Sequence, residues 1–238
     1  NRILFNRLKS DVGFKDFNLS GAVELIADPD ERERYARHGY SFLNPAEVSD
    51  RVGLSVKTHG MFHANAGWVN LYKLCEANIN WIQKNNSAGF TLILNREALR
   101  FENKKDQWQV FDANQKLIAE ASVLVIANGF DCRKFAETSW IPLFEVRGQM
   151  AQLRGDQNFM PKMPLSFGGY LTPPQVSTSG ESFLGLGSTY DWKLKDAQPR
   201  EEDFTEILKN LEDVVALPQG FAKSYEPSLN RVSFRATS

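Results

Sequence analysis

The stretch VLVIANG at residues 123–129 decides the fold. Its first five residues are apolar and mostly β-branched, which is typical of a strand buried on both faces of a parallel sheet. Asn128 and Gly129 follow at the carboxyl end, where open α/β sheets bind their ligands, and a glycine there lets the backbone approach a ligand closely. Taken alone, the same pattern also fits a plain turn between a strand and a helix.

Short elements surround this strand. Strands are predicted at residues 90–94, 98–101, 107–111 and 116–118, as a β-meander, and again at 145–153, 170–172, 182–185 and 231–235. Apolar spacing predicts helices over 70–83 and 201–215, and the second begins with three acidic residues that favour a helix N-terminus. The expected fold class is therefore α+β with an α/β remnant: a mainly antiparallel sheet with helices, joined to a part that contains the buried parallel strand.

Composition restricts the function. The 238 residues carry 28 basic and 29 acidic side chains, so no global field attracts nucleic acid or an anionic membrane, and any RNA contact must be local. No apolar run approaches the roughly 20 residues that span a bilayer. The two cysteines, Cys75 and Cys132, have no metal-ligand spacing, which favours a reduced cytoplasmic protein in which both are small buried hydrophobes.

Two motifs fail on inspection. Gly185-Leu-Gly187 begins like a dinucleotide fingerprint, but Tyr190 occupies the third glycine position and no helix is predicted after it. His59 and His63 are four residues apart, yet Gly60 and the extended surroundings argue against a helix that would hold both as ligands. We therefore expect no metal site.

Six separate stretches carry a family resemblance. They are AGWVN (66–70), VLVIANG (123–129), PLFEVRGQ (142–149), GYLTP (169–173), FLGLGS (183–188) and VSFRAT (232–237). Their order and spacing resemble the D-amino-acid-oxidase-like flavoprotein family over about residues 20–238. Within that family the chain is most similar to the oxidoreductase domains of bifunctional enzymes that modify tRNA.

The resemblance implies a domain division and a reaction. Residues 18–66 and 142–232 would form a substrate domain, 67–141 and 233–238 a remnant of the FAD-binding domain, and 1–17 a connector. FAD would oxidise the carboxymethylaminomethyl group of the wobble uridine in tRNA and remove its carboxymethyl part. A fused methyltransferase domain that uses S-adenosylmethionine is expected upstream.

The resemblance also implies roles for individual residues. Arg235 would hold the substrate carboxylate with help from Tyr170, since the planar guanidinium binds a carboxylate through two hydrogen bonds. Arg147 and Gln149 would lie near the flavin ring and contact substrate. Three residues would approach the FAD through their backbone: Ala98, Asn128 and Gly129.

The chain departs from the family pattern at both ends. It begins without Met, contains no three-glycine fingerprint, and stops directly after a strand-like stretch. We therefore expect a fragment that by itself retains no FAD and is inactive. Two alternatives stay open: an oxidase or dehydrogenase of a free small amine such as glycine, sarcosine or a D-amino acid, and a non-catalytic binding module.

Overall fold

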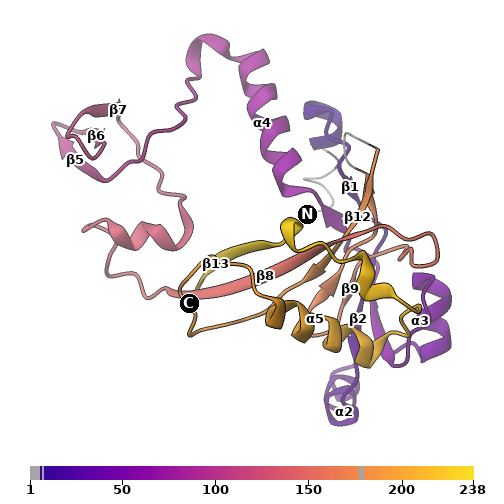
Figure 1. Ribbon diagram of the computed structural model, residues 1–238. Coiled ribbons are helices and arrows are strands. Elements are labelled where there is room, and N and C mark those ends of the chain that lie inside the picture. Colours follow the sequence, from indigo (N-terminus) through magenta and orange to yellow (C-terminus); the bar gives the residue numbers. More distant parts are fainter. Residues whose placement is uncertain (1–5, 7, 177–179) are drawn as a thin grey trace.

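One large sheet organises the structure, a computed structural model that describes residues 6, 8–176 and 180–238 (Figure 1). Its strand order is β13-β8-β12-β10-β9-β2-β3, with β11 paired to β12 outside this path. Neighbours are antiparallel except β2 and β9, which are parallel. The predicted mainly antiparallel sheet is confirmed. Its strands are β2 (Ala22–Ile26), β3 (His59–His63), β8 (Phe144–Arg154), β9 (Leu165–Ser166), β10 (Tyr170–Leu171), β11 (Gln175–Val176), β12 (Ser182–Gly187) and β13 (Arg231–Thr237).

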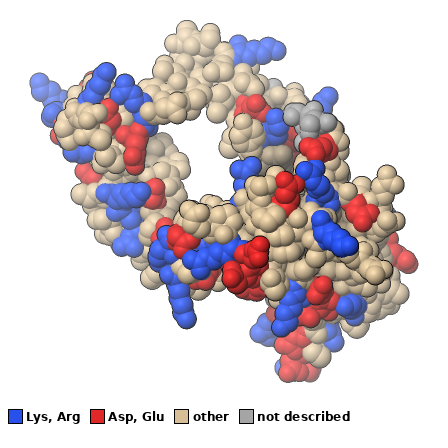
Figure 2. All heavy atoms as spheres, in the orientation of Figure 1, with Lys and Arg blue, Asp and Glu red and all other residues tan. Residues whose placement is uncertain are grey.

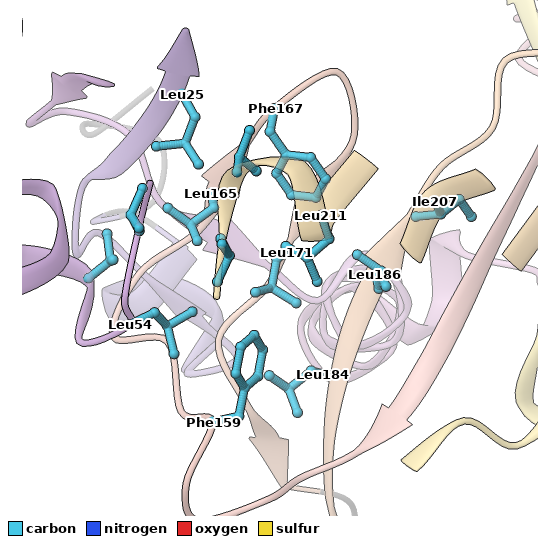
Figure 3. Close-up of a cluster of buried hydrophobic side chains, with 14 of the residues drawn as sticks. Leu25, Leu54, Phe159, Leu165, Phe167, Leu171, Leu184, Leu186, Ile207 and Leu211 are labelled. Carbon is cyan, nitrogen blue, oxygen red and sulfur yellow. The ribbon is translucent and has the colours of Figure 1, made fainter. Parts of the chain in front are cut away.

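The hydrophobic core lies between this sheet and two helices, α3 (Pro45–Val52) and α5 (Glu201–Val214) (Figure 3). Leu184 and Leu186 of β12 enter it from the sheet, and Ile207 and Leu211 enter it from α5. The three acidic residues at the start of α5 and the apolar spacing behind them form the helix that the sequence predicts. A third helix, α2 (Pro29–Arg37), buries no side chain, as its charged sequence indicates.

A long helix leads from the sheet to a smaller unit. Two short paired strands, β1 (Phe17–Asn18) and β4 (Trp68–Val69), precede α4 (Leu71–Asn85), whose first turn is capped by Asn70. The small antiparallel sheet beyond it contains β5 (Arg100–Lys104), β6 (Gln107–Phe111) and β7 (Leu117–Ala121), which confirms three strands of the predicted meander. Figure 2 shows an opening between this unit and the large sheet. Short helical segments complete the elements: η1 (Leu8–Val12), η2 (Ser87–Gly89), η3 (Gly129–Lys134), η4 (Phe221–Ser224) and η5 (Pro227–Leu229).

The predicted buried strand at residues 123–127 is wrong for this chain. These residues belong to no strand, and the side chains of Val123 and Val125 are 73% and 79% exposed. A strand is buried only when other strands pair with it on both edges, and no described strand lies against this segment. Residues 90–94, also predicted as a strand, form no strand either and have no strand partner among the described residues.

Three smaller expectations can be compared with the fold. Residues 233–237, which the domain division placed with the FAD-binding part, pair with β8 in the large sheet; the division itself stays a prediction. Cys132 is buried as expected, but Cys75 is exposed, because α4 buries none of its side chains. None of the described helices combines the length and apolar character needed to cross a membrane.

Candidate substrate and cofactor site

The two faces of the large sheet have different surroundings. Side chains alternate along a strand, so odd-numbered residues of β8 point to one face and even-numbered residues to the other. Ala151 and Leu153 enter the core beside α5. Gly148 and Met150 lie on the opposite face, which we call the open face. Because Arg235 pairs in register with Val146, it belongs to the open face as well.

Tyr170 shares the open face with Arg235. Tyr170 pairs with Gly187, which in turn pairs with Met150, so all three residues share one side of the sheet. The structure therefore brings together the two residues that the sequence assigns to the substrate carboxylate.

Arg235 is half-buried and has neutral partners. Its Nη1 donates to the carbonyl oxygen of Thr189 at 3.2 Å, and its Nη2 donates to the hydroxyl of Ser188. Its guanidinium carbon lies 5.2 Å from the centre of the Tyr190 ring. Within the described residues no carboxylate forms an ion pair with it, whereas most other arginines have one. A cation held in place without an internal anion is suited to bind an external one.

Tyr170 presents a neutral hydroxyl. Burial raises the pKa of its phenol, and the positive charge of Arg235 opposes this only in part. Its hydroxyl lies 3.6 Å from the sulfur of Met150, which is a weak acceptor. The proton is therefore available to a better acceptor, such as a carboxylate oxygen of a bound substrate.

Two glycines make room for these side chains, and sequence reasoning missed them. A Cβ on Gly148 would lie closer than 3.0 Å to the guanidinium of Arg235, and one on Gly187 would lie 2.9 Å from the hydroxyl of Tyr170. For Gly187 the sequence contained a signal that the strand has one face without side chains: in FLGLG at residues 183–187, leucines alternate with glycines. That alternation indicates a strand with a packed face and an empty face.

Gly148→Ala should weaken binding of a carboxylate substrate by roughly tenfold, about 1.4 kcal/mol, because the added methyl group displaces the guanidinium. The measurement is substrate affinity in the FAD-loaded full-length protein, in wild-type and Arg235→Ala backgrounds. The effect should vanish once Arg235 is absent. Gly89→Ala is the matched control, since it lies in the turn after α4 and its Cβ would meet only the side chain of Asn86, at 2.8 Å. An equal loss in both backgrounds would contradict the steric argument.

A groove of about 470 Å³ adjoins Tyr170 on the open face. Met150, Gln152 and Thr172 form its floor on the sheet side, and residues 68–71 at the start of α4 form the facing wall. The groove thus extends the surface that Arg235 and Tyr170 define and leaves space for a substrate larger than an amino acid.

The structure does not place Arg147 and Gln149 beside Arg235 and Tyr170, and their contact with substrate stays a prediction. Both are fully buried on the core face of β8. Arg147 forms an ion pair with Asp203 at 2.7 Å and donates to the carbonyl oxygens of Asp196 and Gln198. The amide of Gln149 bonds to the backbone of Arg200 in both directions, at 2.7 and 2.8 Å. Strand alternation places both side chains under the start of α5, away from Arg235.

Ala98 and Asn128 line one cavity of about 360 Å³ in the small unit. Val110, residues 124–127 and Phe135 supply much of its apolar wall. Gly129 follows at the rim with a φ of 62°, a conformation that favours glycine. The structure thus brings together two of the three residues assigned to the cofactor and places the third beside them.

The fold is shared with solved amine and amino-acid oxidoreductases. The glycine oxidase from Bacillus cereus superposes with a TM-score of 0.75 at 17% identity. The match covers 100% of this chain and 66% of the glycine oxidase chain. The L-proline dehydrogenase from P. horikoshii superposes with a TM-score of 0.71 at 15% identity. The match covers 99% of this chain and 65% of the dehydrogenase chain. At these identities the likeness concerns the fold alone.

The chain belongs to the FAD dependent oxidoreductase family, whose model matches residues 2–236. Curated relatives include the tRNA 5-methylaminomethyl-2-thiouridine biosynthesis bifunctional proteins of Stutzerimonas stutzeri and Pseudomonas fluorescens. They are 28% and 29% identical over 94% of this chain. The chain spans about a third, 34%, of the length of each of these relatives.

The residues present fit part of an FAD molecule. The extended backbone at 123–127 forms no backbone hydrogen bonds within the described residues, so its N–H and C=O groups beside the cavity can pair with a ligand. Gly185 and Gly187 do not supply a phosphate loop, because they lie inside β12 and pair with β8. That the 238-residue chain alone retains no FAD stays a prediction.

His59 and His63 are the first and last residues of β3, which agrees with the extended backbone predicted for this segment. Residues four apart on a strand are about 13 Å apart, too far to share one ion. His63 instead contacts Glu24 at 3.1 Å. In the described part of the chain no group of three or more His, Cys, Asp or Glu side chains is placed to hold a metal.

Proposed function

We propose that this chain supplies the substrate-binding part of an FAD-dependent enzyme that oxidises a CH–NH bond in the carboxymethylaminomethyl group of the wobble uridine of tRNA. The observation that carries the proposal is Arg235: a half-buried cation beside a neutral Tyr170, with no carboxylate partner in the described residues. The names of the curated relatives, which concern tRNA thiouridine biosynthesis, support the choice of substrate.

Each residue has a role that follows from its surroundings. The guanidinium of Arg235 binds the substrate carboxylate, and the hydroxyl of Tyr170 donates a hydrogen bond to the same group. The open face of the sheet, kept free by Gly148 and Gly187, orients the carbon between the carboxylate and the amine. FAD, when bound, supplies the two-electron oxidation of that C–N bond, after which water hydrolyses the imine to an aminomethyl group and glyoxylate.

Ala98, Asn128 and Gly129 would hold part of the FAD at the cavity of the small unit. Arg147 and Gln149 act indirectly, because they fix α5 and the preceding loop beneath β8. A methyltransferase with S-adenosylmethionine would then modify the aminomethyl product. Relatives that are bifunctional by name, and of which this chain spans about a third, support such a fused domain.

The decisive experiment incubates the FAD-loaded full-length protein with tRNA that carries the carboxymethylaminomethyl group. We expect bleaching of the flavin absorbance, one glyoxylate for each flavin reduced, and loss of the carboxymethyl mass from the wobble nucleoside. Glycine, sarcosine and D-amino acids are tested in parallel. Flavin reduction by one of these free amines, without reduction by the tRNA, would replace the proposal with the small-amine alternative. Binding of tRNA without any flavin reduction would favour the non-catalytic module.

A further inference from the structure

Three exposed aromatic side chains form a cluster next to Arg235. Phe144 begins β8, and Tyr190 and Trp192 follow β12; their exposed fractions are 59%, 52% and 50%. The rings of Tyr190 and Trp192 meet edge to face with centres 5.5 Å apart, and Trp192 and Phe144 do so at 6.4 Å. We call these three residues the aromatic cluster.

The backbone beneath the cluster is fixed. Asp191, between the two rings, exchanges backbone hydrogen bonds with Arg147 at 2.8 and 2.9 Å. Its carboxylate accepts hydrogen bonds from the backbone N–H groups of Lys193 and Leu194, and these bonds lower its pKa. Tyr190 also reaches Thr237 of β13, with 3.4 Å between the hydroxyl oxygens. The rings are therefore held in place before any ligand arrives.

The charges around the cluster are mixed. Arg235 contacts the face of Tyr190, and Lys195 donates to the carbonyl oxygen of Glu145 at 3.1 Å. The carboxylates of Glu145 and Asp191 lie in the same region, so the surface is not a phosphate-binding patch. Its distinctive property is flat apolar area, which suits the face of a nucleobase more than the sugar-phosphate backbone.

We infer that the aromatic cluster stacks a base that neighbours the modified uridine in the single-stranded anticodon loop. This inference rests on the proposed function, because Tyr190 contacts the arginine that would hold the carboxylate of the modified base. Proteins bind the unstacked bases of RNA loops on Tyr, Trp and Phe side chains. Trp192 would be the main platform, since it contacts both other rings and its indole N–H has no hydrogen-bond partner among the described residues.

The test measures RNA binding by the FAD-loaded full-length protein. The probe is a short RNA hairpin with the fluorescent base 2-aminopurine beside the modified uridine, because stacking quenches its fluorescence. Trp192→Leu should weaken binding by roughly 5- to 150-fold and abolish the quenching. Trp192→Phe, which retains a ring, should keep most of both. Phe144→Leu should give a smaller loss.

Tyr40→Leu is the matched control. Tyr40 is also 52% exposed and also meets another ring, Tyr35, edge to face at 5.5 Å, but it lies beyond α2. This variant should bind the probe within twofold of wild type. Thermal unfolding of each variant establishes that it is folded.

The outcomes separate this inference from the proposed function. Suppose that the wild-type protein releases glyoxylate from tRNA, and that Trp192→Leu binds the hairpin and quenches its fluorescence as the wild type does. This result would overturn the inference and leave the proposed function standing. Quenching that depends on Trp192, without glyoxylate release, would overturn the proposed reaction and leave the stacking intact. Failure of the wild-type protein to bind the hairpin would overturn both.

Discussion

Arg235→Ala in the FAD-loaded full-length protein should lower the catalytic efficiency with its carboxylate substrate by roughly 30-fold to several thousand-fold. The substitution removes a charge-assisted contact and leaves the substrate anion poorly paired. Truncations of this kind cost about 2–5 kcal/mol. The measurement is single-turnover flavin reduction by modified tRNA, after each variant has been shown to hold FAD.

Two further variants sharpen this test. Arg235→Lys should recover only part of the loss, since an ammonium restores the charge but not the planar pair of donors. Arg37→Ala removes an exposed arginine of α2, which forms a surface ion pair with Glu33, and should change the rate little. If Arg235 only completes the local structure around Ser188 and Thr189, the alanine variant will reduce flavin at the wild-type rate with unchanged substrate affinity.

Arg147→Ala should destabilise the protein by about 3–5 kcal/mol, because it leaves the carboxylate of Asp203 buried without its ion-pair partner. The carbonyl oxygens of Asp196 and Gln198 would lose their donor as well. Urea unfolding of the full-length protein measures the change. The double variant Arg147→Met with Asp203→Leu should recover much of the stability, since replacing both charges removes the unpaired group.

Arg154→Ala is the control for this prediction. Arg154 forms two ion pairs, with Glu181 and Glu226, but its side chain is 52% exposed, so its loss should cost about 1 kcal/mol or less. A weakened substrate affinity in Arg147→Ala without loss of stability would support the predicted contact of Arg147 with the substrate.

Local pattern was enough to predict much of the fold. The apolar spacing and acidic start of α5, and the alternation in β12, each depend on neighbouring residues only, and both elements formed as expected. The strand predicted at 123–127 depends on partners elsewhere in space. Its composition is right for a buried strand, but composition cannot supply the neighbouring strands that would bury it.

The candidate site could be predicted only in part, because some of its features depend on how strands pair and not on local sequence. Arg235 and Tyr170 were assigned through the family resemblance that their short motifs carry, and strand pairing brings them to one face. Arg147 and Gln149 came from a motif as well, but which face of β8 they occupy depends on the register with β12 and β13. A shift of one residue exchanges the two faces. The roles of Gly148 and Gly187 depend on contacts with other strands, which no local pattern specifies.

The segments at 90–94 and 123–127, which pair with no described strand, could promote aggregation of the protein. Their sequences, FTLIL and VLVIA, contain no charge, proline or glycine, and both expose free backbone donors and acceptors along apolar side chains. Segments of this composition stack into cross-β fibrils when copies from different molecules meet. Pairing these segments with other strands would therefore also protect the protein from aggregation, and we expect a variant in which they stay exposed to be degraded more readily.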